Sequence, residues 1–238
     1  MPARMVFFFD PVYFVILIVT LVISGGAQLY IKSTFSKWDK VQNSGTLSGM
    51  QVGERIVSRA NFGGATGTAT GINFKVVPGN LSDHFNPATK QVGLSQDVAT
   101  KRTVAAMAVT AHEVGHAQQD AEGTVAMKAR AFLVPAVTVS PMISYGLIFI
   151  GLIFNNDALF GLGIIVFAVM VLFSVMTLPV EIGASRRALV LLRDSGMLAR
   201  PDDEEGVKRV LAAAALTYVA AAVTSILMLL YYVSLARR

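Results

Sequence analysis

Two apolar stretches separated by three polar residues decide the fold. They read FLVPAVTVSPMISYGLIFIGLIF over 132–154 and ALFGLGIIVFAVMVLFSVMTLPV over 158–180, with Asn155-Asn156-Asp157 between them. Each stretch has the roughly 20 residues that an α-helix needs to cross the hydrocarbon of a bilayer. Because the link has room only for a tight turn, we expect the two helices to be antiparallel neighbours.

Two further stretches, 11–31 and 210–235, have the same length and apolar character. The chain of 238 residues is 54% apolar and only 15% charged, which is typical of a multi-span membrane protein. The run 11–31 is longer than the apolar part of a usual secretory signal, so we interpret it as a retained anchor. The predicted fold is therefore mainly α, a polytopic membrane protein with about four transmembrane helices.

The hydrophilic segments 32–131 and 181–209 lie between these spans. If the spans alternate across the bilayer, both segments lie on one side, which then holds 17 of the 20 Lys and Arg residues. By the positive-inside rule, we expect both segments in the cytoplasm and both termini outside. We expect residues 1–238 to form a single membrane domain.

The larger hydrophilic segment predicts a small α+β portion. An amphipathic helix is expected over 49–60, and short strands at 76–77 and 92–94 are expected to form a β-hairpin around a turn. Glycines within 61–71 should interrupt the chain, and a helix is expected from about 98 to 131. If the strand 92–94 has a free edge, an extended peptide could pair with it.

The last of these helices contains His112-Glu113-Val114-Gly115-His116. Residues four apart share one helical face with Cβ atoms roughly 5–6 Å apart, so both imidazoles can reach one Zn²⁺ ion. Glu113 points about a quarter turn away, where it can take a proton from a metal-activated water. The alternative is a helix with two ordinary surface histidines. The many Ala and Val neighbours favour burial instead, and buried imidazoles and carboxylates need partners.

A third metal ligand is required, because catalytic zinc usually has three protein ligands and a water. The chain has no cysteine and only three histidines, so carboxylates are considered next. Glu181 directly follows the predicted span 158–180, on the same predicted side as the motif, and Ser185 one turn later could hydrogen-bond its carboxylate. Alternatively, Glu181 balances nearby arginines at the membrane surface.

His84 stands in a stretch that favours a turn, Asp83-His84-Phe85-Asn86-Pro87. It could stabilise an oxyanion, contact a substrate or replace Glu181 as the third ligand. It could equally be a turn histidine that hydrogen-bonds nearby backbone. The sequence leaves these alternatives open.

Four motifs in chain order resemble those of the bacterial YugP-like neutral zinc metallopeptidases. They are Leu81–Pro87, Ala111–Gln118, Glu181–Ala188 and Ala214–Ala220. The resemblance covers nearly the whole chain and implies a multi-pass protein of the bacterial cell membrane. It implies zinc on His112 and His116, Glu113 as catalytic base and Glu181 as third ligand. A more distant likeness to HtpX-type and CAAX prenyl proteases differs at Ser185, where those enzymes usually have Asp.

We therefore expect a zinc endopeptidase of the gluzincin type, with a zincin-like cytoplasmic portion near the membrane surface. Its substrates would be membrane proteins or peptides presented near the lipid bilayer. A membrane scaffold with a closed structural zinc site is the alternative, although such a site does not need Glu113. A metal transporter would need ionisable residues within the spans, whose middles are uncharged.

Nucleic acid is not an expected partner, although the formal charge is +5. The Lys and Arg residues are spread through the hydrophilic segments, with no basic tract and no interleaved aromatic residues.

Overall fold

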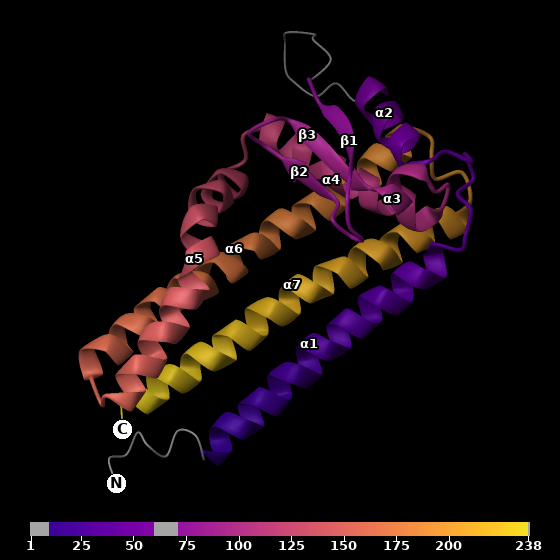
Figure 1. The fold of residues 1–238 in the computed structure, drawn as a ribbon. Coiled ribbons are helices and arrows are strands. Elements are labelled where there is room, and N and C mark those ends of the chain that lie inside the picture. The colour runs from indigo at the N-terminus through magenta and orange to yellow at the C-terminus, as the bar shows by residue number, and fades with distance from the viewer. Residues whose placement is uncertain (1–9, 60–70, 238) are drawn as a thin grey trace. The chain divides into compact units, whose positions relative to one another are not determined.

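The computed structural model describes residues 10–59 and 71–237 (Figure 1). The elements in chain order are α1 (Pro11–Trp38), α2 (Gly49–Arg59), β1 (Asn73–Val77), β2 (His84–Asn86), β3 (Gln91–Ser95), α3 (Gln96–Thr100), α4 (Val104–Ala121), α5 (Val125–Ile153), α6 (Asp157–Asp194) and α7 (Pro201–Ala236). Helices dominate and the sheet is small. The mainly α fold predicted from the sequence is confirmed.

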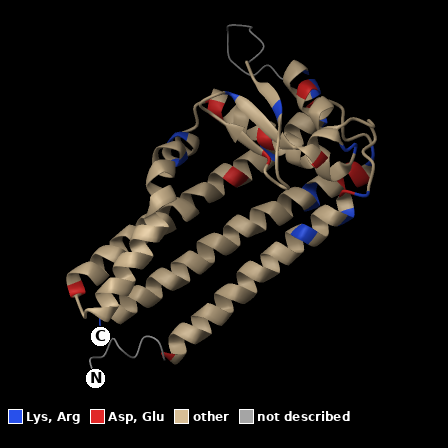
Figure 2. Ribbon diagram, in the orientation of Figure 1, with Lys and Arg blue, Asp and Glu red and all other residues tan. Residues whose placement is uncertain are grey.

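The helices α1, α5, α6 and α7 are long and apolar enough to cross a membrane. Their apolar stretches, 11–31, 132–154, 158–180 and 210–235, contain no charged residue. Figure 2 shows most charged residues in the remaining elements and toward the helix ends. The predicted spans coincide with the apolar parts of these helices, which confirms the prediction of a polytopic protein. Which side of the membrane the hydrophilic segments face stays a prediction.

Contacts within the chain divide it into two compact units. The first consists of Met1–Gln28, Ala129–Leu178 and Thr217–Arg238, and the second of Leu29–Lys128 and Pro179–Leu216. The first unit holds most of the apolar helix length, with a core that includes Phe160, Phe167 and Tyr232. The second unit contains every candidate metal ligand. A single domain over 1–238 stays a prediction.

The sheet in the second unit has three strands in the order β1-β3-β2. The sheet contains a β-hairpin, but β2 and β3 form it. The prediction that 76–77 and 92–94 form the hairpin is wrong, because β1 pairs with β3 in parallel. The prediction of a turn around His84 is wrong, because His84 begins β2 and pairs with Gly93. The condition for peptide pairing at 92–94, a free strand edge, is not met, because β3 is paired on both sides. Within the described residues, β1 and β2 are the edge strands.

The predicted helix from 98 to 131 is three helices in the structure. Thr103 begins α4 as its N-cap, accepting a hydrogen bond from the amide of Ala106 at 3.2 Å. Gly123 has φ +62°, a left-handed conformation that ends a helix, and α5 starts two residues later. The spacing of apolar residues did not reveal this break, because the helical period continues on both sides of it.

The amphipathic helix predicted over 49–60 is confirmed as α2, although Ala60 lies outside the described residues. Val52 and Ile56, one turn apart, are fully buried in a core that includes Val104, Ala108 and Ala111 of α4. The predicted break at 61–71 lies outside the described residues except for Gly71. The packing of α2 and of the sheet against α4 holds the helix that carries the candidate metal ligands.

Candidate metal centre

The two histidines of α4 lie side by side on one helical face. Their ring centroids are 4.7 Å apart and the rings are nearly perpendicular. The side chains are 13% and 7% exposed for His112 and His116, respectively. The helical spacing alone places the rings together, and the surrounding core excludes most of the solvent.

The carboxylate of Glu181 in α6 meets both imidazoles. Its Oε2 lies 3.2 Å from Nε2 of His112 and 3.4 Å from Nε2 of His116. The residue is 1% exposed. The structure thus brings together three residues that lie up to 69 positions apart.

A glycine in the middle of the motif allows this meeting. A Cβ atom on Gly115 would lie 2.5 Å from the carbonyl oxygen of Ala184 in α6, closer than real contacts allow. Gly115 therefore lets the backbones of α4 and α6 approach each other beside the cluster. The small residue Ala184, three positions after Glu181, is itself fully buried at this contact.

The three side chains fit a zinc ion. One ligand atom from each of His112, His116 and Glu181 can be chosen so that all lie within 4.8 Å of one another. Bonds of about 2.0–2.1 Å in a tetrahedral zinc site place neighbouring ligand atoms about 3.3 Å apart. The observed separations of 3.2 and 3.4 Å between Oε2 and the Nε2 atoms match that spacing. Two imidazoles and a carboxylate are also a donor set that zinc accepts in catalytic sites.

Glu113 lies beside this cluster but is not one of its three members. The residue is 7% exposed. Burial raises the pKa of Glu113 to about 7, with the His112 imidazole opposing the rise and the Glu181 carboxylate adding to it. A carboxyl group in this range can both accept and release a proton near neutral pH.

Each imidazole of the cluster has a polar group at its Nδ1 atom. The hydroxyl oxygen of Ser185 lies 3.3 Å from Nδ1 of His112, and Oε1 of Gln119 lies 3.0 Å from Nδ1 of His116. Ser185 was expected to hydrogen-bond Glu181, and its contact in the structure is with His112. The sequence analysis missed Gln119; its position three residues after His116, one helical turn away, is the signal that could have revealed it.

His84 is the first residue of the edge strand β2. Its Nδ1 lies 2.8 Å from the carbonyl oxygen of Ser82, and its ring covers Gly93, where a Cβ atom would lie 2.8 Å from Cε1. His84 is exposed and is not a member of the three-residue cluster. The geometry therefore brings Glu181, and not His84, to the two histidines of α4.

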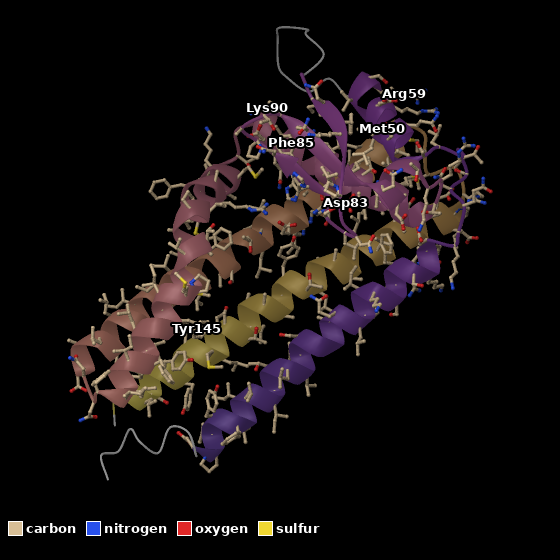
Figure 3. All side chains as sticks on the ribbon, viewed as in Figure 1. Met50, Arg59, Asp83, Phe85, Lys90 and Tyr145 are labelled. Atoms are coloured by element: carbon tan, nitrogen blue, oxygen red, sulfur yellow. The ribbon has the colours of Figure 1, made fainter. Side chains whose placement is uncertain are left out.

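Asp83, labelled in Figure 3, anchors the start of β2. Its Oδ1 accepts hydrogen bonds from the amide of Ser95 at 2.7 Å and from the Ser95 hydroxyl at 3.1 Å. Burial raises the pKa of Asp83, while the bonds from Ser95 act in the opposite direction. Asp83 therefore fixes the edge strand and the position of His84, which follows it.

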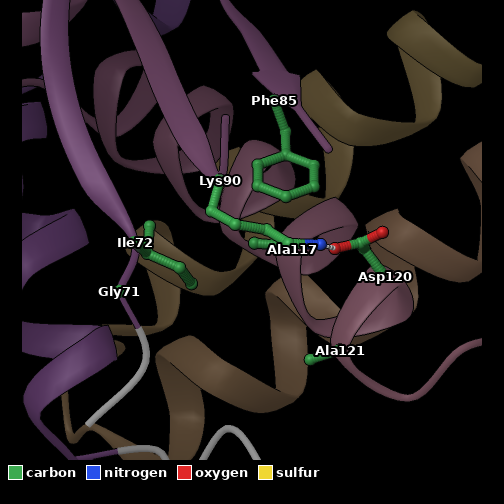
Figure 4. A pocket seen from close by; sticks show the side chains of 7 residues that line it. All are labelled: Gly71, Ile72, Phe85, Lys90, Ala117, Asp120 and Ala121. Atoms are coloured by element: carbon green, nitrogen blue, oxygen red, sulfur yellow. Dashed lines mark hydrogen bonds and ion pairs between the residues drawn. The ribbon is translucent and has the colours of Figure 1, made fainter. Parts of the chain in front are cut away.

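A hollow of about 180 Å³ lies between the sheet and the end of α4 (Figure 4). Phe85, Ile72, Ala117 and Ala121 supply most of its apolar wall, and the ion pair of Lys90 with Asp120 closes one side. Ala117 lies one helical turn after Glu113 on the same face of α4. The hollow is thus a continuation of the surface that carries Glu113.

Comparisons with known proteins identify the family of the chain. Residues 13–237 match the sequence profile of a family described as "Putative neutral zinc metallopeptidase". The chain belongs to this family. It is 37% identical over 220 residues to "Putative membrane protease YugP" of Bacillus subtilis (strain 168), an alignment that covers 91% of this chain and 92% of the relative. No solved structure is significantly similar to the chain.

Proposed function

We propose that the protein is a membrane-embedded zinc endopeptidase in which His112, His116 and Glu181 hold the metal and Glu113 is the general base. The observation that carries the proposal is the meeting of these three ligands beside the buried carboxyl group of Glu113. Zinc bound there would lower the pKa of a water molecule to about 7 and polarise a substrate carbonyl.

Glu113 would move the proton during peptide hydrolysis. It accepts a proton from the attacking water as the carbon–oxygen bond forms, and it donates this proton to the leaving amine as the carbon–nitrogen bond breaks. Its burial keeps bulk water away, so the proton passes between Glu113 and the reacting atoms. His84, on the edge strand β2, is proposed to contact the substrate or its developing oxyanion.

The substrates would be membrane or membrane-proximal proteins. Four helices are long and apolar enough to cross a bilayer, and Glu181 directly follows one of the apolar stretches along the chain. This short connection would keep the reacting centre near the membrane surface. The distribution of Lys and Arg favours the cytoplasmic side.

The hollow beside α4 is proposed to take an apolar side chain of the substrate. Its volume of about 180 Å³ resembles that of a cavity of roughly 150 Å³ that accepts benzene. The variant Ala121→Leu partly fills it, and Gln118→Leu on the same helix is a control outside its lining. Ala121→Leu should shift cleavage of a peptide library toward smaller side chains at one position; an unchanged preference would contradict this assignment.

A closed structural zinc site would support a scaffold function instead. Such a site usually has four protein ligands. Within the described residues, the cluster brings together three groups of the metal-binding type, which favours a catalytic site with one open position.

The test is metal content and hydrolysis of an unfolded protein substrate by detergent-purified variants. Wild type should hold about one zinc, Glu181→Ala should lose most of it, and Glu113→Gln should keep zinc but lose hydrolysis. Glu54→Gln, which changes an exposed carboxylate on α2, should match the wild type in both. Absence of zinc from the wild type, or full activity of Glu113→Gln, would overturn the proposal.

A further inference from the structure

We infer that Gln119 is a positioning residue that sets the proton of His116 on Nδ1 and thereby turns the free electron pair of Nε2 toward the metal position. The inference rests on the proposed metal ligands and adds a residue that the motif does not include. Gln119 is 3% exposed and lies one helical turn after His116.

The orientation of the Gln119 amide follows from its second contact. Its Nε2 lies 2.8 Å from the carbonyl oxygen of Val180, which can only accept a hydrogen bond. The nitrogen of the amide must therefore face Val180, and the oxygen must face His116. A flipped amide would place two acceptors against each other at Val180.

The orientation of the amide decides the tautomer of the imidazole. Oε1 of Gln119 lies 3.0 Å from Nδ1 of His116, and because this oxygen only accepts, Nδ1 must donate. In a neutral imidazole the other nitrogen, Nε2, then has no proton. Nε2 lies 3.4 Å from the Glu181 carboxylate, so two acceptors face each other, an arrangement that a cation between them stabilises.

Gln119 also links the two helices that carry the ligands. Val180, whose carbonyl it binds, immediately precedes Glu181 in α6. A Cβ atom on Gly183 would lie 2.6 Å from Nε2 of Gln119, so this glycine leaves the space that the amide occupies. One buried side chain therefore contacts a ligand on α4 and the backbone beside the ligand on α6.

Two substitutions separate these contacts. Gln119→Glu keeps an oxygen acceptor for Nδ1 of His116 but loses the amide donor to Val180, whereas Gln119→Leu keeps the approximate volume and loses both. Gln118 is a matched control of the same residue type, because it is the adjacent residue and none of the hydrogen bonds above involves its side chain. Gln118→Leu and Gln118→Glu should therefore behave as wild type.

The first measurement is the ¹⁵N spectrum of the imidazoles in metal-free protein at about pH 9, where ordinary imidazoles are neutral. The chain has only three histidines, so each signal can be assigned by substitution. His116 should be protonated on Nδ1 in the wild type, in Gln119→Glu and in both Gln118 variants. In Gln119→Leu the proton should shift toward Nε2. This readout needs neither bound metal nor activity.

The second measurement is zinc affinity by competition with a chelator. Gln119→Leu should weaken binding about 10–100-fold, and Gln119→Glu should restore it to within about threefold of wild type. The inference is overturned if His116 of the wild type carries its proton on Nε2, or if Gln119→Leu binds zinc as wild type does. Equal losses in the Leu and Glu variants would also overturn it, because the helix link alone would then account for both. If the wild type binds no zinc, the proposed function itself is refuted.

Discussion

Several polar side chains in the apolar helices bond to their own helix, whereas Gln119 and Ser185 beside the metal cluster bond to a second helix. Thr138, Ser174 and Thr224 each donate to the carbonyl four residues earlier, at 2.8, 3.0 and 2.8 Å. In the cluster, Gln119 of α4 reaches Val180 of α6, 61 positions away. A bond within one helix survives any rearrangement that keeps the helix, while a bond between helices exists only in the folded unit. Substitutions should therefore have larger effects around the cluster.

The largest effect is expected for Glu113→Gln, which removes the proposed proton carrier but preserves the shape of the side chain. General acid–base catalysis is typically worth about 10²–10⁴-fold in rate, so kcat should fall by roughly that factor. Steady-state hydrolysis of an unfolded substrate measures this loss, with zinc content determined on the same samples. A comparable loss in the control Glu54→Gln would show that the effect is not specific to the cluster.

A glycine in each region offers a matched comparison of packing. Gly115→Ala places a Cβ atom 2.5 Å from the Ala184 carbonyl oxygen, whereas Gly146 of α5 has nothing within 4 Å of its added Cβ. Gly115→Ala should lower the free energy of unfolding by about 1–3 kcal/mol and weaken zinc binding. Gly146→Ala should be neutral or stabilising by up to about 1 kcal/mol. Denaturant unfolding in detergent compares the two; equal effects would contradict the close helix approach at Gly115.

A buried carboxylate at the start of α7 should show a pH dependence. Asp203 accepts hydrogen bonds from the amides of Ser44 and Arg200 and from the Arg200 guanidinium, the last at 2.9 Å. Burial tends to raise its pKa, but these bonds outweigh it and lower the pKa below the usual value. Its stabilisation is therefore present above the ordinary Asp range and is lost as pH falls through the lowered pKa.

Asp203→Asn should lower the free energy of unfolding by about 1–2 kcal/mol at neutral pH. The difference from wild type should shrink below about pH 4, because the wild-type carboxylate then becomes protonated as well. Unfolding midpoints measured between about pH 3 and 7 test this. A difference that stays constant over the range would show that the charge of Asp203 contributes nothing.

The smallest effect is expected for Thr224→Val in α7. The hydroxyl of Thr224 bonds to the Ala220 carbonyl within the same helix, and that carbonyl keeps its helical partner when the hydroxyl is removed. Stability should change by less than about 0.5 kcal/mol. Thermal unfolding beside Gly115→Ala provides the comparison; a loss as large as that of Gly115→Ala would contradict the difference between the two regions.

Local sequence patterns predicted well those elements whose structure depends mainly on their own residues. The four apolar helices follow from length and hydropathy, and α2 follows from apolar residues on one helical face. The strands were harder to predict, because β2 is only three residues long and the parallel pairing of β1 with β3 depends on contacts made after a crossover. The residues around His84 therefore predict a turn, although His84–Asn86 form a strand in the structure.

The features of the candidate site also fall into two groups, those that follow from local sequence and those that depend on tertiary contacts. By itself, the sequence determined that His112 and His116 share a helical face with Glu113 beside them, because helical periodicity is a local property. Only the tertiary structure decided that Glu181 meets both imidazoles, that Ser185 contacts His112 and that Gln119 joins His116 to α6. These contacts connect residues far apart in the chain. They depend on how closely α4 and α6 approach at Gly115, and no periodicity in either helix specifies that distance.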